Sequence, residues 1–281
     1  PHGVGEKSVV ENIFKDGGSL MKVLDFEHRR EQTEMAIAVV DALQNGTHLL
    51  FEAGTGVGKS LAYLIPSLIH AIQNNRPCVV ATNTINLQEQ LLEKDIPAVR
   101  KVFESDERYH WFADFKCALL VGRANYLCNT RLHRALSGQA DFLDRGQRKE
   151  LERIAEWANE GAIEGIRQEM SPPPSSAVWD QVNADSSLCS NKRCHPDHCC
   201  YRRARARVES ANLVIINHSL LFSLLGAGFG PGDDEGGVLF ADDFIVFDEA
   251  HEMPDVASDH LGLSISSWAL ETFLRRLYNP R

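Results

Sequence analysis

Residues 53 to 60 read Ala53-Gly54-Thr55-Gly56-Val57-Gly58-Lys59-Ser60. An apolar run, residues 48–52, precedes them, and an apolar stretch that begins at Leu61 follows. A strand, a glycine-rich turn and a helix in this order form the context of a phosphate-binding loop, where backbone N–H groups and a helix N-terminus surround phosphate oxygens. The stretch therefore predicts a nucleotide site; only Ala53 departs from the strict pattern, which has glycine there.

The side chains and the backbone of this loop have separate expected tasks. Lys59 would reach the β- and γ-phosphates, and the hydroxyl of Ser60 would be offered to Mg²⁺. The backbone around the phosphates would come from five consecutive residues, Gly54, Thr55, Gly56, Val57 and Gly58. A glycine-rich turn with a chance Gly-Lys-Ser is the alternative interpretation, but the flanking patterns agree with the motif.

An acidic element follows a second apolar run, residues 243–247, and reads Asp248-Glu249-Ala250-His251. An acidic pair at the carboxyl end of an apolar strand is typical of an ATP-hydrolysing site. Asp248 would hold the Mg²⁺ shell, Glu249 would orient or deprotonate the attacking water, and His251 would couple the nucleotide state to the rest of the protein. A surface turn is the alternative interpretation of this acidic element, and the presence of a phosphate-binding loop in the same chain argues against it.

Composition limits the class of protein. The chain has 281 residues, 43% of them hydrophobic, a net charge of −10 and seven cysteines. No run approaches the ~18 apolar residues of a membrane span, and no secretory signal is present, so we expect a cytoplasmic monomer that does not bind membranes. The charge argues against a uniformly basic surface but allows a local basic track. For cysteines in such a chain, metal or cluster ligation is favoured over disulfides.

The order of apolar runs indicates an α/β fold. Five runs predict parallel strands: residues 48–52, 77–82, 116–121, 212–217 and 244–248. Helical patterns separate the first three, for example Leu61 to Ile72 and Leu87 to Phe103. Strands that alternate with helices predict a parallel sheet with helices on both faces.

The segment from about 122 to 205 is longer than a connection between two strands requires, so we interpret it as an inserted subdomain. A helical pattern runs from Arg148 to Ile166, with apolar residues at helical spacing: Leu151, Ile154, Ala158 and Ile163. A proline-rich breaker follows at residues 171–176. Between Pro172 and Arg205 the sequence is short of core-forming residues, which predicts that this part needs a covalent or metal staple.

Five cysteines flank the insertion: Cys128, Cys189, Cys194, Cys199 and Cys200. The other two, Cys78 and Cys117, lie in strand patterns and are expected to be core thiols. Structural zinc sites usually have a pair of cysteines on each side, whereas here one side has a single cysteine. The uneven spacing suits an iron–sulfur cluster at least as well, so spacing alone leaves zinc, iron–sulfur and simple reduced thiols open.

Together, the phosphate-binding loop, the Asp-Glu-Ala-His box and the intervening cysteines resemble the DinG/XPD group of superfamily 2 iron–sulfur DNA helicases, in its bacterial DinG-like branch. Four further segments carry the resemblance: Arg29-Arg30-Glu31-Gln32, Thr82-Asn83-Thr84 with the Leu87-Gln88 pair, Gly122 to Cys128, and Ala211 to His218. The resemblance implies a P-loop RecA-like motor domain in residues 1–116 and 206–255, an iron–sulfur domain in 117–205 and the start of an arch domain in 256–281.

The resemblance also implies the activity and its cofactors. It implies ATP, Mg²⁺ and a [4Fe–4S] cluster in a 5′–3′ DNA helicase that moves along single-stranded DNA and unwinds forked or structured duplex DNA in repair or replication. By the same resemblance, we expect the second motor domain, with its arginine fingers, to lie outside these 281 residues. Because such an arginine is worth about 10³ to 10⁵ in rate, we expect this chain alone to be poorly active.

Site residues carried over from the resemblance fall into three groups. Arg29 and Gln32 would lie on the adenine side, and the cluster ligands would be Cys128, Cys189, Cys194 and one of Cys199 and Cys200. Counting forward from Cys194 favours Cys200, whereas counting back from Asn217 favours Cys199, which we expect. The DNA contacts would be Thr82, Asn83, Gln88, Arg202, Arg203 and Arg205.

Two alternatives stay open for the nucleic-acid side. Arg193 and Arg207 extend the arginine group into a phosphate-binding track, and Tyr126 and Tyr201 offer stacking faces, but the arginines could also form a solvated face paired with Glu209 and its neighbours. The alternative function is a zinc-stabilised, nucleic-acid-binding P-loop scaffold without unwinding activity.

Overall fold

The computed structural model describes residues 5–25, 27–54, 56–139, 144–185, 189, 198–226 and 244–261. The strands are β1 (Cys78–Thr82), β2 (Cys117–Leu119), β3 (Leu213–Asn217) and β4 (Phe244–Phe247). The helices before and around them are α1 (Glu6–Phe14), α2 (Ser19–Leu24), α3 (Arg30–Asn45), α4 (Lys59–Asn74), α5 (Ile85–Gln90), α6 (Ile96–Glu104), α11 (His218–Gly226) and α12 (Met253–Leu261). The short turns among them are η1 (Leu91–Asp95), η2 (His110–Asp114) and η7 (Ala250–Glu252).

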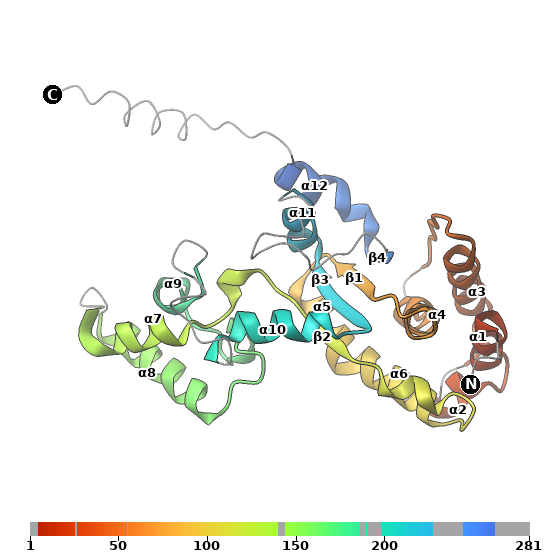
Figure 1. Ribbon diagram of the computed structural model, residues 1–281, viewed down its shortest axis with the longest axis horizontal. Helices are drawn as coiled ribbons and strands as arrows, with labels where there is room; N and C mark the ends of the chain where they lie inside the picture. Colours follow the sequence, from red (N-terminus) through yellow and green to blue (C-terminus); the bar gives the residue numbers. More distant parts are fainter. Residues whose placement is uncertain are drawn as a thin grey trace.

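Between β2 and β3 the chain forms a second group of elements. These are η3 (Arg123–Asn125), α7 (Asn129–Arg134), η4 (Ala135–Gln139), α8 (Arg145–Glu160), η5 (Arg167–Glu169), α9 (Ser176–Val182) and α10 (Cys200–Glu209). We call this group the insertion lobe, and the elements α1 to β2 and β3 to α12 the sheet lobe. The two lobes lie side by side in an elongated molecule, with α1 to α4 at the end opposite the insertion (Figure 1). Within the described ranges, no helix combines the length and the apolar character that a membrane crossing requires.

The four strands form one parallel sheet in the order β2-β3-β1-β4, which confirms the predicted α/β class. Every residue of β1 is buried, as expected for a central strand that helices cover on both faces. Val80 of β1 is paired with Ile215 on one side and Val246 on the other. Because all strands are parallel, the carboxyl ends of β1 and β4 lie together, where α/β sheets place their ligands.

The predicted strand at 48–52 is wrong, since these residues form no strand in the structure. Leu50 is 90% exposed and Leu49 is 43% exposed. Both edges of the central strand β1 are taken by β3 and β4, and residues 48–52 pair with neither of the outer strands, β2 and β4. The apolar run therefore leads into the phosphate-binding loop as an extended segment outside the sheet.

Two predicted helices have different bounds. The pattern from Leu87 to Phe103 is helical throughout, but a π-helical turn, η1, separates α5 from α6. The pattern from Arg148 to Ile166 forms α8 only as far as Glu160, because Gly161 takes a left-handed conformation (φ 104°) that ends the helix. Leu151 and Ile154 are buried as predicted, whereas Ile163, beyond the helix end, is 79% exposed.

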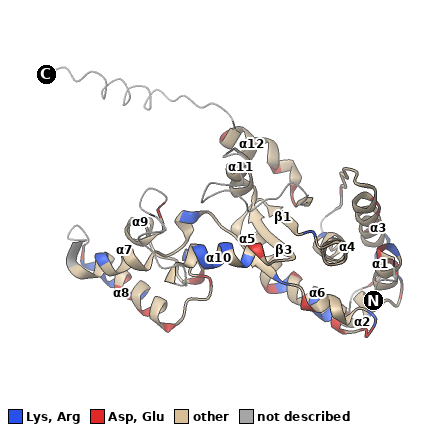
Figure 2. Cartoon of the chain, in the orientation of Figure 1, with Lys and Arg blue, Asp and Glu red and all other residues tan. Residues whose placement is uncertain are grey.

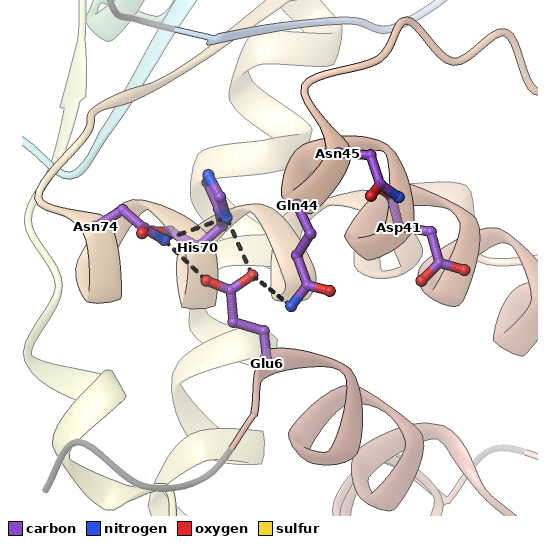
Figure 3. Close-up of polar contacts among 6 residues, drawn as sticks. All are labelled: Glu6, Asp41, Gln44, Asn45, His70 and Asn74. Carbon is purple, nitrogen blue, oxygen red and sulfur yellow. Dashed lines mark hydrogen bonds and ion pairs between the residues drawn. The ribbon is translucent and has the colours of Figure 1, made fainter.

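A polar cluster around the buried side chains of Glu6 and His70 joins α1, α3 and α4. The carboxylate of Glu6 in α1 lies 3.0 Å from His70 Nδ1 in α4 and accepts hydrogen bonds from Asn74 (2.8 Å) and Gln44 (3.4 Å), as Figure 3 shows. The ring of His70 also meets the ring of Phe244 in β4 edge-on, with centroids 5.4 Å apart. Hydrogen bonds compensate the burial of these polar groups, so they fix α1 against the helix that follows the phosphate-binding loop.

The insertion lobe has a core of its own. Val178, Trp179 and Val182 of α9 are buried, and the indole Nε1 of Trp179 donates a 2.8 Å hydrogen bond to the carbonyl of Ala124. The sequence between Pro172 and Arg205 thus contributes a small core, and its need for a covalent or metal staple stays a prediction. Few apolar residues occur there, but they lie on one face of a short helix, and a single tryptophan contributes much of the buried surface.

Candidate nucleotide-binding site

The phosphate-binding loop and the acidic element meet at the carboxyl edge of the sheet. Lys59, the first residue of α4, places its Nζ 3.1 Å from Oε1 of Glu249, and each side chain is 30% exposed. Asp248, which directly follows β4, donates its backbone N–H to the carbonyl of Ala81 at 2.9 Å. A lysine, a carboxylate pair and a helix N-terminus thus converge from segments 190 residues apart.

Glu249 is held in an unusual position. Its backbone is left-handed (φ 53°, ψ 46°), a conformation that a non-glycine residue adopts at a cost of about 1–3 kcal/mol. Its carboxylate lies between Lys59 and His251, whose Nδ1 is 3.5 Å from Oε2 of Glu249. The ring of His251 is largely exposed and its Nε2 is 3.3 Å from Glu252. The structure therefore connects Lys59, Glu249 and His251, to which the sequence assigned roles in phosphate binding, catalysis and coupling.

Asp248, the member of the acidic pair that directly follows β4, is half-buried. Burial and the neighbouring carboxylate of Glu249 raise the pKa of Asp248, and the charge of Lys59 opposes this shift. A bound divalent cation would favour the ionised form, because two carboxylates in one place are costly without a positive partner. Ser60, predicted to coordinate that cation, lies on the same side of α4 as these groups and interacts with a third carboxylate, Asp95.

Asp95 and Tyr63 are site residues that sequence reasoning missed. Tyr63 is 3% exposed, and its hydroxyl lies beside Ser60 and Asp248. Burial, Asp248 and Asp95 raise the pKa of Tyr63 well above its usual value, so the phenol keeps its proton. Both residues fall inside ordinary helical patterns, and the sequence offers no spacing that marks them as neighbours of the acidic element.

The glycines of the loop adopt the conformations that a phosphate cradle needs. Gly56 and Gly58 have φ of 82° and 83°. Gln32, predicted for the adenine side, is buried and donates from Nε2 to the carbonyl of Gly58 at 3.0 Å, while Arg29 is exposed. Gly54 and Val57 lie in the same loop, and Thr55 lies outside the described residues. In this arrangement Gln32 supports the loop backbone.

The residues predicted to contact DNA near β1 are mostly internal. Thr82 and Gln88 are buried, and Asn83 is half-buried. The Thr82 hydroxyl donates to the carbonyl of Thr84 (3.2 Å), and neither polar side-chain atom of Gln88 has a hydrogen-bond partner in the described structure. In this conformation only Asn83 offers part of its side chain to a ligand on the surface, and the DNA contacts at these positions stay a prediction.

The cysteines of the insertion lobe lie at its helix starts and in a loop. Cys128 directly precedes α7, Cys199 directly precedes α10, and Cys189 lies in the loop after α9. Cys194 lies outside the described residues. Among the residues that are described, no three His, Cys, Asp or Glu side chains approach closely enough to hold a metal ion, and the six cysteines present form no disulfide. As predicted for a core thiol, Cys78 is buried; Cys117 is half-buried.

The adjacent cysteines Cys199 and Cys200 have different surroundings. Cys200 is 3% exposed, and a Cβ placed on Gly165 would lie only 2.4 Å from its Sγ. Its sulfur also receives a 3.5 Å contact from the guanidinium of Arg203. Cys199 is half-buried and is not packed into this niche.

Positive side chains gather on α10, beside the sheet (Figure 2). Arg203 is exposed, Arg202 and Arg205 are half-buried, and Arg207 pairs with Glu164 rather than with Glu209. Tyr126 is fully buried and cannot stack on a base, so that expectation is wrong. One face of Tyr201 is covered by the guanidinium of Arg123, 4.5 Å from the ring centroid.

Comparisons with known proteins agree with this arrangement. The family described as "DEAD/DEAH box helicase" matches residues 33–118, and the family described as "DEAD_2" matches residues 92–270. The ATP-dependent DNA helicase YoaA of Haemophilus influenzae is 34% identical over 263 residues, which are 92% of this chain and 38% of that protein.

Two further relatives carry a DinG name. The ATP-dependent helicase DinG of Mycobacterium tuberculosis is 34% identical over 89% of this chain and 38% of its own length. The 3'-5' exonuclease DinG of Bacillus subtilis is 31% identical over 90% of this chain and 25% of its length. The chain thus spans less than half of each of these relatives, and it belongs to the DEAD_2 family, as a DinG-like helicase segment.

Proposed function

We propose that this chain forms the nucleotide-binding part of the first motor of an ATP-dependent DNA helicase, together with an inserted lobe that faces DNA. The observation that carries the proposal is the convergence of Lys59, Asp248 and Glu249 at the carboxyl edge of the sheet. The relatives named as DNA helicases support the choice of substrate. The division into a motor (1–116 and 206–255), a cluster domain (117–205) and the start of an arch domain (256–281) belongs to the proposal.

The geometry suggests how binding and hydrolysis would be linked. Lys59 and Glu249 neutralise each other, and the γ-phosphate of ATP would compete with Glu249 for the ammonium group. A carboxylate released in this way is available to orient or deprotonate a water molecule beside the phosphate. Mg²⁺ would be held by Ser60 and Asp248 and would supply charge stabilisation for the transferred phosphoryl group.

The test is the affinity for a fluorescent ATP analogue in the presence of Mg²⁺. Lys59→Ala should abolish detectable binding, because charge-assisted hydrogen bonds are worth about 1.5–3 kcal/mol each and Lys59 would make them to two phosphates. Lys101→Ala, which removes an exposed lysine of α6, is the matched control and should bind like the wild type. Equal affinity in the wild type and in Lys59→Ala, with unchanged unfolding curves, would contradict the proposal.

For the insertion lobe, we propose a [4Fe–4S] cluster held by Cys128, Cys189, Cys194 and Cys199. The donor set fits in its chemistry, since the described cysteines of this lobe form no disulfide, and thiolates are the usual ligands of such clusters. The packing of Cys200 against Gly165 supports Cys199 as the fourth ligand, because Cys200 would have to leave a buried niche to bind iron. Iron content of Cys199→Ser compared with Cys200→Ser, both purified anaerobically, tests this choice.

We further propose that single-stranded DNA passes along α10 during 5′–3′ translocation and that the protein acts as a monomer on forked or structured duplexes. The exposed and half-buried arginines Arg202, Arg203 and Arg205 support a phosphate-binding track. A zinc-stabilised scaffold without unwinding is the second candidate. Zinc instead of iron after anaerobic purification would favour it.

A further inference from the structure

Asp95 does not have the role that its position in the chain suggests. It is the last residue of the π-helical turn η1 and directly precedes α6, where an aspartate commonly caps the helix with its side chain. Asp95 makes no such bond, and its own backbone is already helical (φ −74°, ψ −43°). π-helical turns are rare and frequently mark functional sites. Helix capping therefore leaves this half-buried carboxylate unexplained.

The surroundings of Asp95 connect it to the nucleotide site. The turn η1 packs against α4, and the carboxylate of Asp95 lies near the hydroxyl of Ser60 and the carboxylate of Asp248, close enough for both to influence its pKa. Oδ2 of Asp95 is buried and has no hydrogen-bond partner in the described structure.

A second polar group points to the same place. Tyr63 comes from one turn further along α4 than Ser60 and is 3% exposed, and its hydroxyl lies near Ser60 and Asp248. This hydroxyl makes no hydrogen bond of ordinary geometry with any described group. A buried polar group without a partner costs about 1–3 kcal/mol, so two of them beside one carboxylate indicate a place that a polar ligand completes.

We propose that Asp95 is a positioning residue of the magnesium–nucleotide site: its carboxylate would accept a hydrogen bond from the Ser60 hydroxyl, and its Oδ2 would accept one from a water molecule of the cation. This inference rests on the proposed nucleotide site. A hydroxyl that coordinates a cation through its oxygen must direct its proton elsewhere, and Asp95 is the acceptor at hand. Mg²⁺ keeps several of its waters, whose protons also need acceptors. The hydroxyl of Tyr63, which has no partner in the described structure, would donate to Asp248 when the cation is bound and would thereby hold the second cation ligand.

The experiment measures the cation itself, with Mn²⁺ in place of Mg²⁺. Binding of Mn²⁺ in the presence of ADP is followed by the electron paramagnetic resonance signal of the free ion, for the whole protein that carries this chain. Asp95→Asn should weaken Mn²⁺ binding about 10- to 100-fold, the usual effect of removing an outer partner of a metal ligand. Tyr63→Phe should weaken it less, and Glu93→Gln, on the exposed side of the same turn, should have no effect.

A second readout separates this inference from the proposed function. Affinity for a fluorescent ADP analogue in excess EDTA should be the same in the wild type and in Asp95→Asn, because the phosphate loop is intact. If the wild type binds Mn²⁺–ADP and both Asp95→Asn and Tyr63→Phe bind it equally well, Asp95 has no positioning role. If the wild type binds no nucleotide at all, the proposed function and this inference fall together.

Discussion

The sheet lobe and the insertion lobe bury their apolar residues in different ways. In the sheet lobe, Cys78 of β1 lies beside Leu213 and Phe244, so the core is assembled from distant parts of the chain. In the insertion lobe, the buried residues lie between Tyr126 and Val208, and two isolated bridges, Tyr126 with Ile166 and Leu127 with Asn183, join segments within that range. The nucleotide site therefore depends on pairing between the two ends of the chain, whereas the insertion lobe is held by contacts among its own segments and by a small core.

The strongest test of this difference removes a proposed cluster ligand. Cys194→Ser should lose the iron and increase protease cleavage between about residues 125 and 205, because a structural metal contributes directly to folding. Nucleotide binding should survive, since Lys59 belongs to the other lobe. The α9 core should limit the damage, so we expect local opening rather than collapse of the lobe. Full iron content in Cys194→Ser would contradict the cluster assignment.

Removal of the central tryptophan tests the core without touching a ligand. Trp179→Ala should destabilise the insertion lobe by about 3–5 kcal/mol, the usual cost of deleting a large buried side chain. Hydrogen exchange should increase in α8 and α9 and stay unchanged in β1. Trp111→Ala, in the sheet lobe and 39% exposed, is the control and should change little. If exchange rose equally in β1, the two lobes would not be separate folding units.

The pH dependence of stability should be carried in part by Glu6, in the sheet lobe. Burial alone raises the pKa of Glu6, but hydrogen bonds and the charge of His70, together with Asn74 and Gln44, lower it overall from 4.5. A lowered folded pKa means that the unfolded chain binds protons more readily. The contribution is therefore complete above about pH 4.5 and is lost as the pH falls through the folded value.

Chemical unfolding between pH 6 and pH 3 measures this contribution. Glu6→Gln should reduce the loss of stability on acidification, whereas Glu11→Gln, an exposed residue of the same helix, should leave the profile unchanged. An identical profile in Glu6→Gln would show that the cluster in Figure 3 does not respond to pH.

The smallest expected effect is a difference in DNA binding between variants of two arginines of α10, Arg202 and Arg207. Arg202→Gln should weaken single-stranded DNA binding. The slope of the logarithm of the binding constant against the logarithm of the salt concentration should become shallower by about 0.7, the value for one phosphate contact. Arg207→Gln removes the same charge, but Arg207 is already paired with Glu164, so the slope should stay near the wild-type value. Equal slopes in both variants would indicate that only the overall charge of α10 matters.

Most of the sheet and the acidic element could be predicted from sequence, because continuous apolar runs and a glycine-rich turn have a direct physical meaning. The failures have physical causes. The run at 48–52 has the composition of a strand but pairs with no strand of the described sheet, and Tyr126 has a stacking side chain but no exposure. Asp95 and Tyr63 could not be found, because their relation to Asp248 exists only after α4 packs on the π-helical turn.

The contact between Gln32 and Gly58 also bears on how sequence motifs are read. A side chain on residue 58 would require a left-handed backbone (φ 83°), and its first carbon would lie 2.2 Å from Nε2 of Gln32. This glycine is thus favoured by the backbone conformation of the loop and by the place of the Gln32 side chain, in addition to any phosphate. A descendant that had lost its nucleotide would still be under pressure to keep Gly58, so the retention of this glycine by itself does not demonstrate an active motor.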